Sequence, residues 1–132
     1  MTRSELREQA FILLFEYSFC KESAEELFDI ARETDTFVED EYLKEVVSTA
    51  ITNILQIDEL IGKYSNGWSA ERIARVTLAA LRVAVAEIKY IDTIPESVSI
   101  NEAVEIIKKY ATEQDVAFAN GILGSIVRAD KD

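Results

Sequence analysis

Residues 94–127, which read IPESVSINEAVEIIKKYATEQDVAFANGILGSIV, decide the fold more than any other stretch of the chain. The only proline, Pro95, precedes a first run of apolar side chains, which ends near Ala111. After a short polar break, a second run carries Phe118, Asn120 and Gly121 among its apolar positions. Apolar residues three and four positions apart are typical of amphipathic helices. The stretch therefore predicts a helical hairpin with small and polar residues set into its apolar pattern.

Capping signals mark both helices of this hairpin. Ser99 with Glu102 has the spacing of a capping box, in which a serine hydroxyl and a glutamate satisfy the free amides of a first helical turn. Thr112 can cap the second helix, which is predicted to run to about Ala129.

The rest of the chain has the same helical spacing. It predicts helices from Arg3 to about Cys20, from a Ser23 cap to about Glu33, from about Glu39 to Ile61, and, after a short segment capped by Ser69, through Ile91. No window alternates with a period of two for long enough to predict a strand. The chain is expected to be a single all-α domain spanning residues 1–132. Its six to seven helices should pack as two small bundles around the apolar helix Val76–Ala86.

The amino-acid composition indicates the cellular compartment in which the protein is expected. The 132 residues are enough for one core, and 48% of them are hydrophobic. Cys20 is the only cysteine, which favours a reducing compartment. The longest apolar run, Val76 to Ala86, is interrupted by Arg82 and is too short to span a bilayer, and the first residues lack the apolar segment of a signal peptide. A cytoplasmic protein without membrane contact is expected.

The charge balance is acidic. The sequence holds 14 basic and 25 acidic residues, a net charge of −11, and most of the excess acid lies in residues 1–66. Binding to phosphates requires local positive charge. An RNA-binding role would therefore depend on a small basic patch and on a basic partner.

Nothing in the sequence predicts catalysis. There is no histidine, so the commonest general base and metal ligand is missing. The acidic residues of 22–45 have the spacing of solvated helix faces, and the four glycines stand apart instead of forming a phosphate-binding loop. We expect no enzyme activity, no metal site and no cofactor.

Three stretches together resemble the NusB family of transcription antitermination factors. They are TRSELREQAFILLFEYSF near the start, WSAERIARVTLAALRVAVAEI in the middle, and the INEAVE and F-x-NG-x-L motifs near the end. The resemblance covers roughly the whole chain. It implies an all-helical fold without enzymatic activity that binds the single-stranded boxA element of nascent RNA together with the small ribosomal protein NusE. Other transcription elongation factors and RNA polymerase would then be indirect partners.

The resemblance also implies site residues. Those implied in RNA binding are Arg3, Arg7, Tyr17, Lys108, Phe118, Asn120 and Gly121, and those implied in partner binding are Thr77, Leu78 and Gln114. Tyr17 is expected to stack on unpaired bases, whereas Phe15 is expected in the core. Gly121 is expected to permit close approach between helices.

The chain departs from the family pattern at several of these places. Ser4, Glu5 and Ala117 stand where basic residues are usual, and Thr77 and Leu78 stand where charged residues are frequent in the partner-contacting helix. These departures predict weaker RNA binding with a smaller salt dependence, and a less ionic partner contact. The alternative is a helical protein–protein adaptor with little RNA binding of its own. A carboxylate-based metal enzyme is disfavoured, and the oligomeric state stays open between monomer and homodimer.

Overall fold

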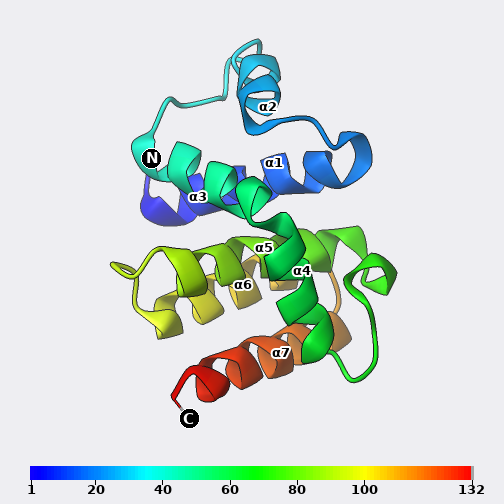
Figure 1. Ribbon diagram of the computed structural model, residues 1–132. Coiled ribbons are helices and arrows are strands. Elements are labelled where there is room, and N and C mark those ends of the chain that lie inside the picture. Colours follow the sequence, from blue (N-terminus) through cyan, green and yellow to red (C-terminus); the bar gives the residue numbers. More distant parts are fainter. Residues whose placement is uncertain (132) are drawn as a thin grey trace.

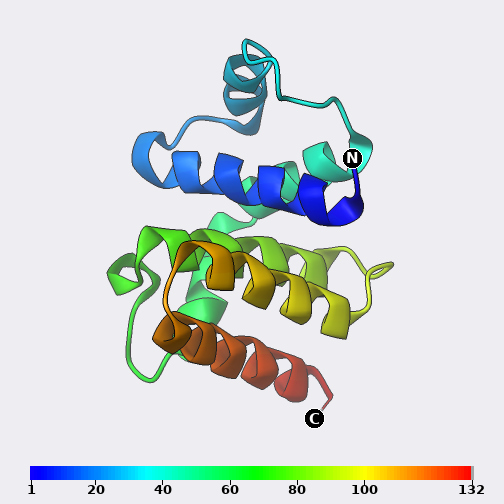
Figure 2. The ribbon, with the colours of Figure 1, turned by 180° about the vertical axis from the view of Figure 1, so that it is seen from behind.

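The computed structural model describes residues 1–131, and the side chains of residues 1–130. Within this part the chain forms seven α-helices and one 3₁₀ turn, and no strand, so the all-α prediction is confirmed (Figures 1 and 2). The elements are α1 (Arg3–Cys20), α2 (Ala24–Ala31), α3 (Glu41–Thr52), α4 (Ile54–Lys63), η1 (Ala70–Arg72), α5 (Arg75–Tyr90), α6 (Glu96–Tyr110) and α7 (Glu113–Lys131).

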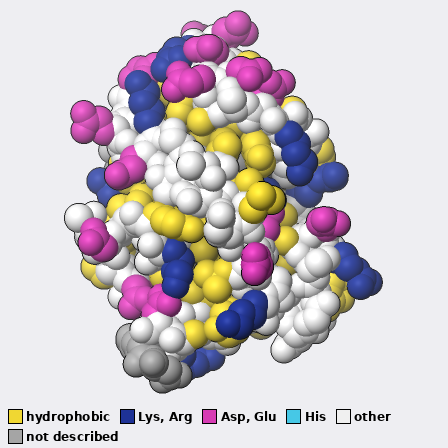
Figure 3. Space-filling view, viewed as in Figure 1, with side chains coloured by type: hydrophobic (Ala, Val, Ile, Leu, Met, Phe, Trp, Pro, Cys, Tyr) yellow, Lys and Arg dark blue, Asp and Glu magenta, His cyan; other side chains and the backbone are white. Residues whose placement is uncertain are grey.

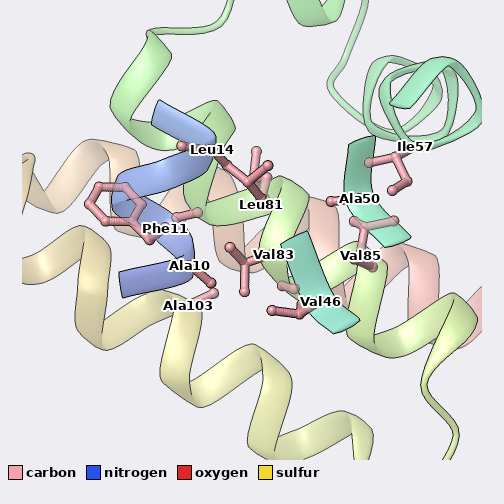
Figure 4. Packing of buried hydrophobic residues seen from close by; sticks show 14 of the residues in the cluster. Ala10, Phe11, Leu14, Val46, Ala50, Ile57, Leu81, Val83, Val85 and Ala103 are labelled. Atoms are coloured by element: carbon pink, nitrogen blue, oxygen red, sulfur yellow. The ribbon is translucent and has the colours of Figure 1, made fainter. Parts of the chain in front are cut away.

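Helix α5 is the centre of the molecule. Every residue from Thr77 to Glu87 is buried, as expected for a helix that is apolar all round. Five helices pack against it: α1, α3, α4, α6 and α7. Figure 4 shows how side chains of α1, α3, α4 and α6 converge on it, and the labelled residues of α5 are Leu81, Val83 and Val85. The predicted core helix is therefore correct.

The other helices lie on two sides of α5. Helices α1, α2 and α3 form the upper part in both ribbon views, and α7 forms the lower edge (Figures 1 and 2). Helices α6 and α7 make the predicted hairpin and pack against each other. The C-terminal end of α1 and the N-terminal ends of α5 and α7 lie at one end of the molecule (Figure 2).

The predicted single helix over 39–61 is wrong. The chain leaves helical geometry at Asn53, where φ is −108° and ψ is 24°. The Asn53 side-chain amide donates to the carbonyl oxygen of Thr49 at 2.9 Å and occupies an acceptor near the end of α3. Helix α4 then leaves at a steep angle to α3 (Figure 1). Apolar periodicity continues through the break, which is why the sequence pattern concealed it.

The cap predictions have mixed outcomes. The hydroxyl oxygen of Ser23 accepts the amide of Glu26 at 3.1 Å, and that of Thr112 accepts the amide of Asp115 at 3.2 Å, so both of these caps are confirmed. The capping box at Ser99 is wrong. Helix α6 begins one turn earlier, directly after Pro95, and Ser99 is buried inside it.

Candidate nucleic-acid interface

Arg7 is at the centre of a buried polar network that joins α1, α3, α5 and α6. Its Nε donates to Glu87 Oε2 at 2.7 Å, and its Nη1 donates to Glu102 Oε1 at 2.7 Å. Glu87 is fully buried, and it also accepts hydrogen bonds from the hydroxyls of Tyr42 and, at 2.7 Å, of Ser99. Each oxygen of the Glu87 carboxylate is thereby satisfied, as a buried charge requires.

This network corrects the role predicted for Arg7. Only 2% of the residue is exposed, so it cannot present its guanidinium to RNA in this conformation. Burial lowers the pKa of Arg7, but the hydrogen bond and charge of Glu87 outweigh that effect and raise the pKa above its ordinary value. Burial and the neighbouring Glu87 also raise the pKa of Tyr42, which keeps its hydroxyl protonated as a donor. Arg7 therefore holds helices together.

The surface above Arg7 is a groove between α1 and α6 that mixes both signs of charge. Lys108 contacts Glu105 at 3.3 Å, and Lys109 contacts Glu8 at 2.8 Å. The hydrogen bond that Lys109 donates to Glu8 raises the pKa of Lys109. Both lysines are exposed, so the predicted phosphate contact of Lys108 remains sterically open. Each lysine nevertheless shares its surroundings with a carboxylate, which weakens the local positive potential.

Arg3 is exposed at the N-terminal end of α1. Its guanidinium carbon lies 4.1 Å from the centre of the Tyr42 ring. The small hollow beside it is also lined by Glu41 and Glu45. Arg3 can therefore reach an external phosphate, but in an acidic setting.

Of the two aromatic predictions on α1, that for Tyr17 is wrong, whereas Phe15 packs against the core as expected. Tyr17 is buried with 9% exposure, and its ring lies 5.9 Å from the guanidinium carbon of Arg82. Phe15 is only half-buried and packs edge-on against Phe19, with ring centres 5.0 Å apart. Phe19 itself is 59% exposed. The aromatic ring available at this end of α1 is therefore Phe19, a residue that the sequence analysis did not select.

A tight turn presents the only tryptophan to solvent. Asn66 and Gly67 both have positive φ angles, 53° and 90°. The buried Ser65 hydroxyl fixes the turn by donating to the carbonyl oxygens of Gly62, at 2.9 Å, and of Trp68. The side chain of Trp68 leaves this turn 48% exposed. Such exposure is unusual for an indole ring and is typical of a binding surface.

Two arginines accompany the exposed rings. The guanidinium carbon of Arg72 lies 5.2 Å from the Trp68 ring centre, and that of Arg75 lies 4.5 Å from the Phe19 ring centre. Neither arginine makes an ion pair with a carboxylate among the described residues, in contrast to Arg7, Lys108 and Lys109. We call Phe19, Trp68, Arg72 and Arg75 the basic flank.

Acidic and basic side chains also occupy different parts of the surface. Acidic side chains gather at the top of the molecule over α2, and several Lys and Arg side chains lie along the right-hand edge, the side that carries η1 in Figure 1 (Figure 3). Most of the basic flank lies in the segment 68–75, directly before the apolar run of α5. A lone tryptophan after an Asn-Gly turn, followed by two arginines, was a sequence signal that could have identified it.

Helix α7 carries the Phe-x-Asn-Gly residues beside this flank. Phe118 is half-buried and separates two hollows, whereas Asn120 and Gly121 are exposed. Gly121 lines the hollow that also contains Tyr64, Asn66 and Arg128. A Cβ atom at Gly121 would meet nothing within 4 Å. The prediction that Gly121 permits close packing between helices of this chain is therefore wrong.

The other hollow, which we call the α5–α7 hollow, has a volume of about 460 Å³. Its lining residues come from η1, α5 and α7 and the segments that join them: Trp68, Arg72, Ile73, Ala74, Thr77, Gln114, Asp115 and Phe118. Gln114 is exposed at its rim, which agrees with a contact role. Thr77 and Leu78 are 1% and 5% exposed, and this burial does not fit the partner contact predicted for them. Thr77 lines the hollow, and Leu78 belongs to the core.

The predicted site residues thus fall into separate groups. Arg7 and Lys108 line the α1–α6 groove, while Thr77, Gln114 and Phe118 line the α5–α7 hollow. Arg82, which interrupts the apolar run of α5, is paired with Asp58 through two hydrogen bonds of 2.9 and 2.7 Å.

The described residues contain no group of three or more His, Cys, Asp or Glu side chains placed to hold a metal ion. None of their helices is both long and apolar enough to cross a membrane.

Comparisons with known proteins agree with this fold. The model of the NusB family matches residues 4–128. The transcription antitermination protein NusB of Agathobacter rectalis is 45% identical over 127 residues, which cover 93% of this chain and 97% of that protein.

Two solved structures are also similar. One is a crystal structure of the antitermination factors NusB and NusE in complex with double-stranded RNA, where the matching chain has a TM-score of 0.85 and 32% identity, with 98% of this chain and 99% of that chain covered. The other is NusB of T. maritima, with a TM-score of 0.79, 35% identity and coverages of 97% and 92%. On the extent of these matches, this chain belongs to the NusB family of transcription antitermination proteins.

Proposed function

We propose that this protein binds the boxA element of nascent ribosomal RNA together with the small ribosomal protein NusE, and that it acts in antitermination without enzymatic activity. The observation that carries the proposal is the basic flank. There, two arginines stack on exposed aromatic rings and make no ion pair with the described carboxylates. Phosphates need such cations, and unpaired bases stack on such rings.

Two further points support this proposal. A relative of closely similar structure was solved with NusE and RNA. That RNA was double-stranded, whereas exposed aromatic rings suit single-stranded RNA, so we propose the single-stranded form. With a net charge of −11, the chain should bind RNA weakly alone, and NusE would supply the missing positive charge. Contacts with other elongation factors and RNA polymerase would then be indirect.

The direct test compares RNA binding by the mixture with binding by each protein alone. Labelled single-stranded boxA RNA, a scrambled strand and a boxA duplex are titrated with this protein, with NusE, and with both. The mixture should bind the boxA strand at least tenfold more tightly than either protein, and more tightly than it binds the other two RNAs. Equal affinity for boxA and scrambled RNA would contradict the proposal.

The adaptor function is the second candidate, because the cations of the α1–α6 groove share their surroundings with carboxylates. Arg3→Glu is a suitable probe, since Arg3 is exposed and outside the buried network. An RNA-binding factor that uses this end of α1 should lose about fivefold in RNA affinity at 0.1 M salt, the effect of about one phosphate contact. An adaptor should keep its affinity for NusE and show no change with RNA.

The variant Gly121→Ala tests whether Gly121 lies in a binding interface. The substitution should stabilise the fold, but it should weaken the binding of a partner that approaches the backbone at this position. Alanine is about 1 kcal/mol more favourable than glycine inside a helix, and the space at Gly121 is open. Gly121→Ala should therefore raise the melting temperature by about 3 °C. If RNA or NusE approaches the backbone here, the same variant should weaken binding.

Gly124→Ala is the matched control on the same helix. Its added Cβ would lie 3.1 Å from Nη1 of Arg128, the flexible end of a side chain. It should leave binding unchanged. Unchanged binding by Gly121→Ala as well would remove Gly121 from the interface.

A further inference from the structure

The α5–α7 hollow has the dimensions and walls of a pocket for a flat ring. Trp68 is half exposed on one side, Phe118 is half-buried on another, and the Arg72 guanidinium covers the indole ring at 5.2 Å. The volume of about 460 Å³ is within the range of small-ligand sites. Two aromatic rings and a cation in one hollow are the components with which proteins hold single-stranded nucleic acids.

The hollow also contains an unsatisfied donor. Thr77 lines it, is 1% exposed, and its Oγ1 has no hydrogen-bond partner among the described residues. A threonine in a helix usually donates to the carbonyl four residues earlier, but this one does not. A buried hydroxyl without a partner is unfavourable to the fold. A ligand that accepts this hydrogen bond would remove the penalty.

The backbone adds donors at the same place. Helix α5 begins after Ala74, which also lines the hollow and has no side chain able to cap the first turn. The first amides of a helix have no partner inside it. Together with the Thr77 hydroxyl, they make this end of α5 a site for an acceptor atom.

The surroundings favour a neutral flat ligand over an isolated phosphate. The carboxylate of Asp115 lines the hollow and would repel a bare anion. The Gln114 side chain at the rim can both donate and accept, which suits the edge of a base. Arg72 and Arg75, stacked on rings beside the hollow, are placed to contact the phosphates on either side. A protein side chain is the competing occupant, but a peptide would not need these stacked arginines.

We propose that the α5–α7 hollow binds one unpaired nucleobase of the RNA, stacked on Trp68, with the Thr77 hydroxyl donating to an acceptor on the base. This inference rests on the proposed RNA-binding function and deepens it. It assigns the base-stacking role to Trp68, which the sequence analysis did not select, and it moves Thr77 from partner contact to base contact.

Trp68 makes the first experiment direct, because it is the only tryptophan of the chain. Single-stranded boxA RNA is added to this protein with NusE, any tryptophan of NusE being replaced by phenylalanine. Anisotropy of the labelled RNA reports binding, and indole fluorescence reports occupancy of the hollow. Both signals should saturate at the same RNA concentration, with the fluorescence quenched.

Three other outcomes would each overturn the inference. Full binding by anisotropy without a change at Trp68 would leave the RNA-binding function intact but place the bases elsewhere. A change on adding NusE alone, with none on adding RNA, would identify a protein occupant. No RNA binding by the mixture would contradict the proposed function and the pocket together.

A substitution series tests the base contact itself. Thr77→Val keeps the shape of the side chain and removes the hydroxyl, so the fold should be at least as stable, while RNA affinity falls about fivefold, the effect of one hydrogen bond. Trp68→Ala should weaken binding tenfold or more through lost stacking. Thr93→Val, at the opposite end of α5, is the matched control and should change nothing.

RNAs with one base removed at each position in turn complete the series. At a single position, removal of the base should weaken binding to the wild type but have no further effect on Trp68→Ala. If every position shows the same loss in both proteins, no base occupies the hollow.

Discussion

Replacing Arg7 by methionine is expected to lower the free energy of unfolding by about 3–5 kcal/mol. Methionine fills much the same space, but it leaves the fully buried carboxylate of Glu87 without its cation. Breaking a buried ion pair in this way is far more harmful than losing a surface charge, which is worth about 0–1 kcal/mol. Urea unfolding followed by circular dichroism measures the difference.

A second variant identifies the cause. In Arg7→Met combined with Glu87→Gln, the buried charge is gone while the new amide oxygen can still accept from Tyr42 or Ser99. The double variant should therefore be more stable than Arg7→Met alone. A loss below about 1 kcal/mol for the single variant would mean that Arg7 is solvated, and the role predicted for it in RNA binding would return.

The second large effect is expected on RNA affinity. Reversing both charges of the basic flank, with Arg72→Glu and Arg75→Glu, should weaken binding of the NusE mixture to single-stranded boxA RNA by about 30-fold or more at 0.1 M salt. The slope of log affinity against log salt should also become shallower by about 1.4, because two phosphate contacts are lost. Titrations at several salt concentrations give both numbers.

Lys44→Glu with Lys89→Glu is the control for this change. It alters the net charge of the chain by the same amount, but Lys44 is on α3 and Lys89 is near the far end of α5. Equal losses for the two double variants would show a general charge effect and would remove the basic flank from the RNA contact.

Helix identity was predictable from sequence because it depends on local periodicity. The bounds of α1 agree with the prediction at both ends, and the buried helix α5 was evident from its apolar run. The errors arose where a side chain has two possible uses. Ser99 has the spacing of an N-cap, but its hydroxyl donates to Glu87, which lies on another helix. No local sequence pattern reveals that acceptor. Asn53 interrupts an apolar stripe that continues on both sides.

The site was less predictable because residue type does not determine exposure. Arg7 and Arg72 are both arginines near a helix start, yet one is paired inside the molecule and the other stacks on an exposed ring. Tyr17 and Phe19 are two positions apart on α1 and therefore face different directions. A small error in the expected helix face was enough to select the buried ring of Tyr17 in place of the exposed ring of Phe19. The residues chosen by family resemblance on α7 did prove accessible, and their RNA contacts stay a prediction.

The interruption at Asn53 has a consequence for how the two halves of the molecule depend on each other. An unbroken helix from Glu41 to Lys63 would be a straight rod of about 34 Å, and its end could not turn toward α7. The break redirects α4, so that its last turn packs against the Trp68–Ala70 segment, whose backbone lies within van der Waals reach of Gly62. The single non-helical residue Asn53 thus sets the direction of α4. Through that direction, the acidic N-terminal half of the chain determines where Trp68 and the neighbouring arginines lie.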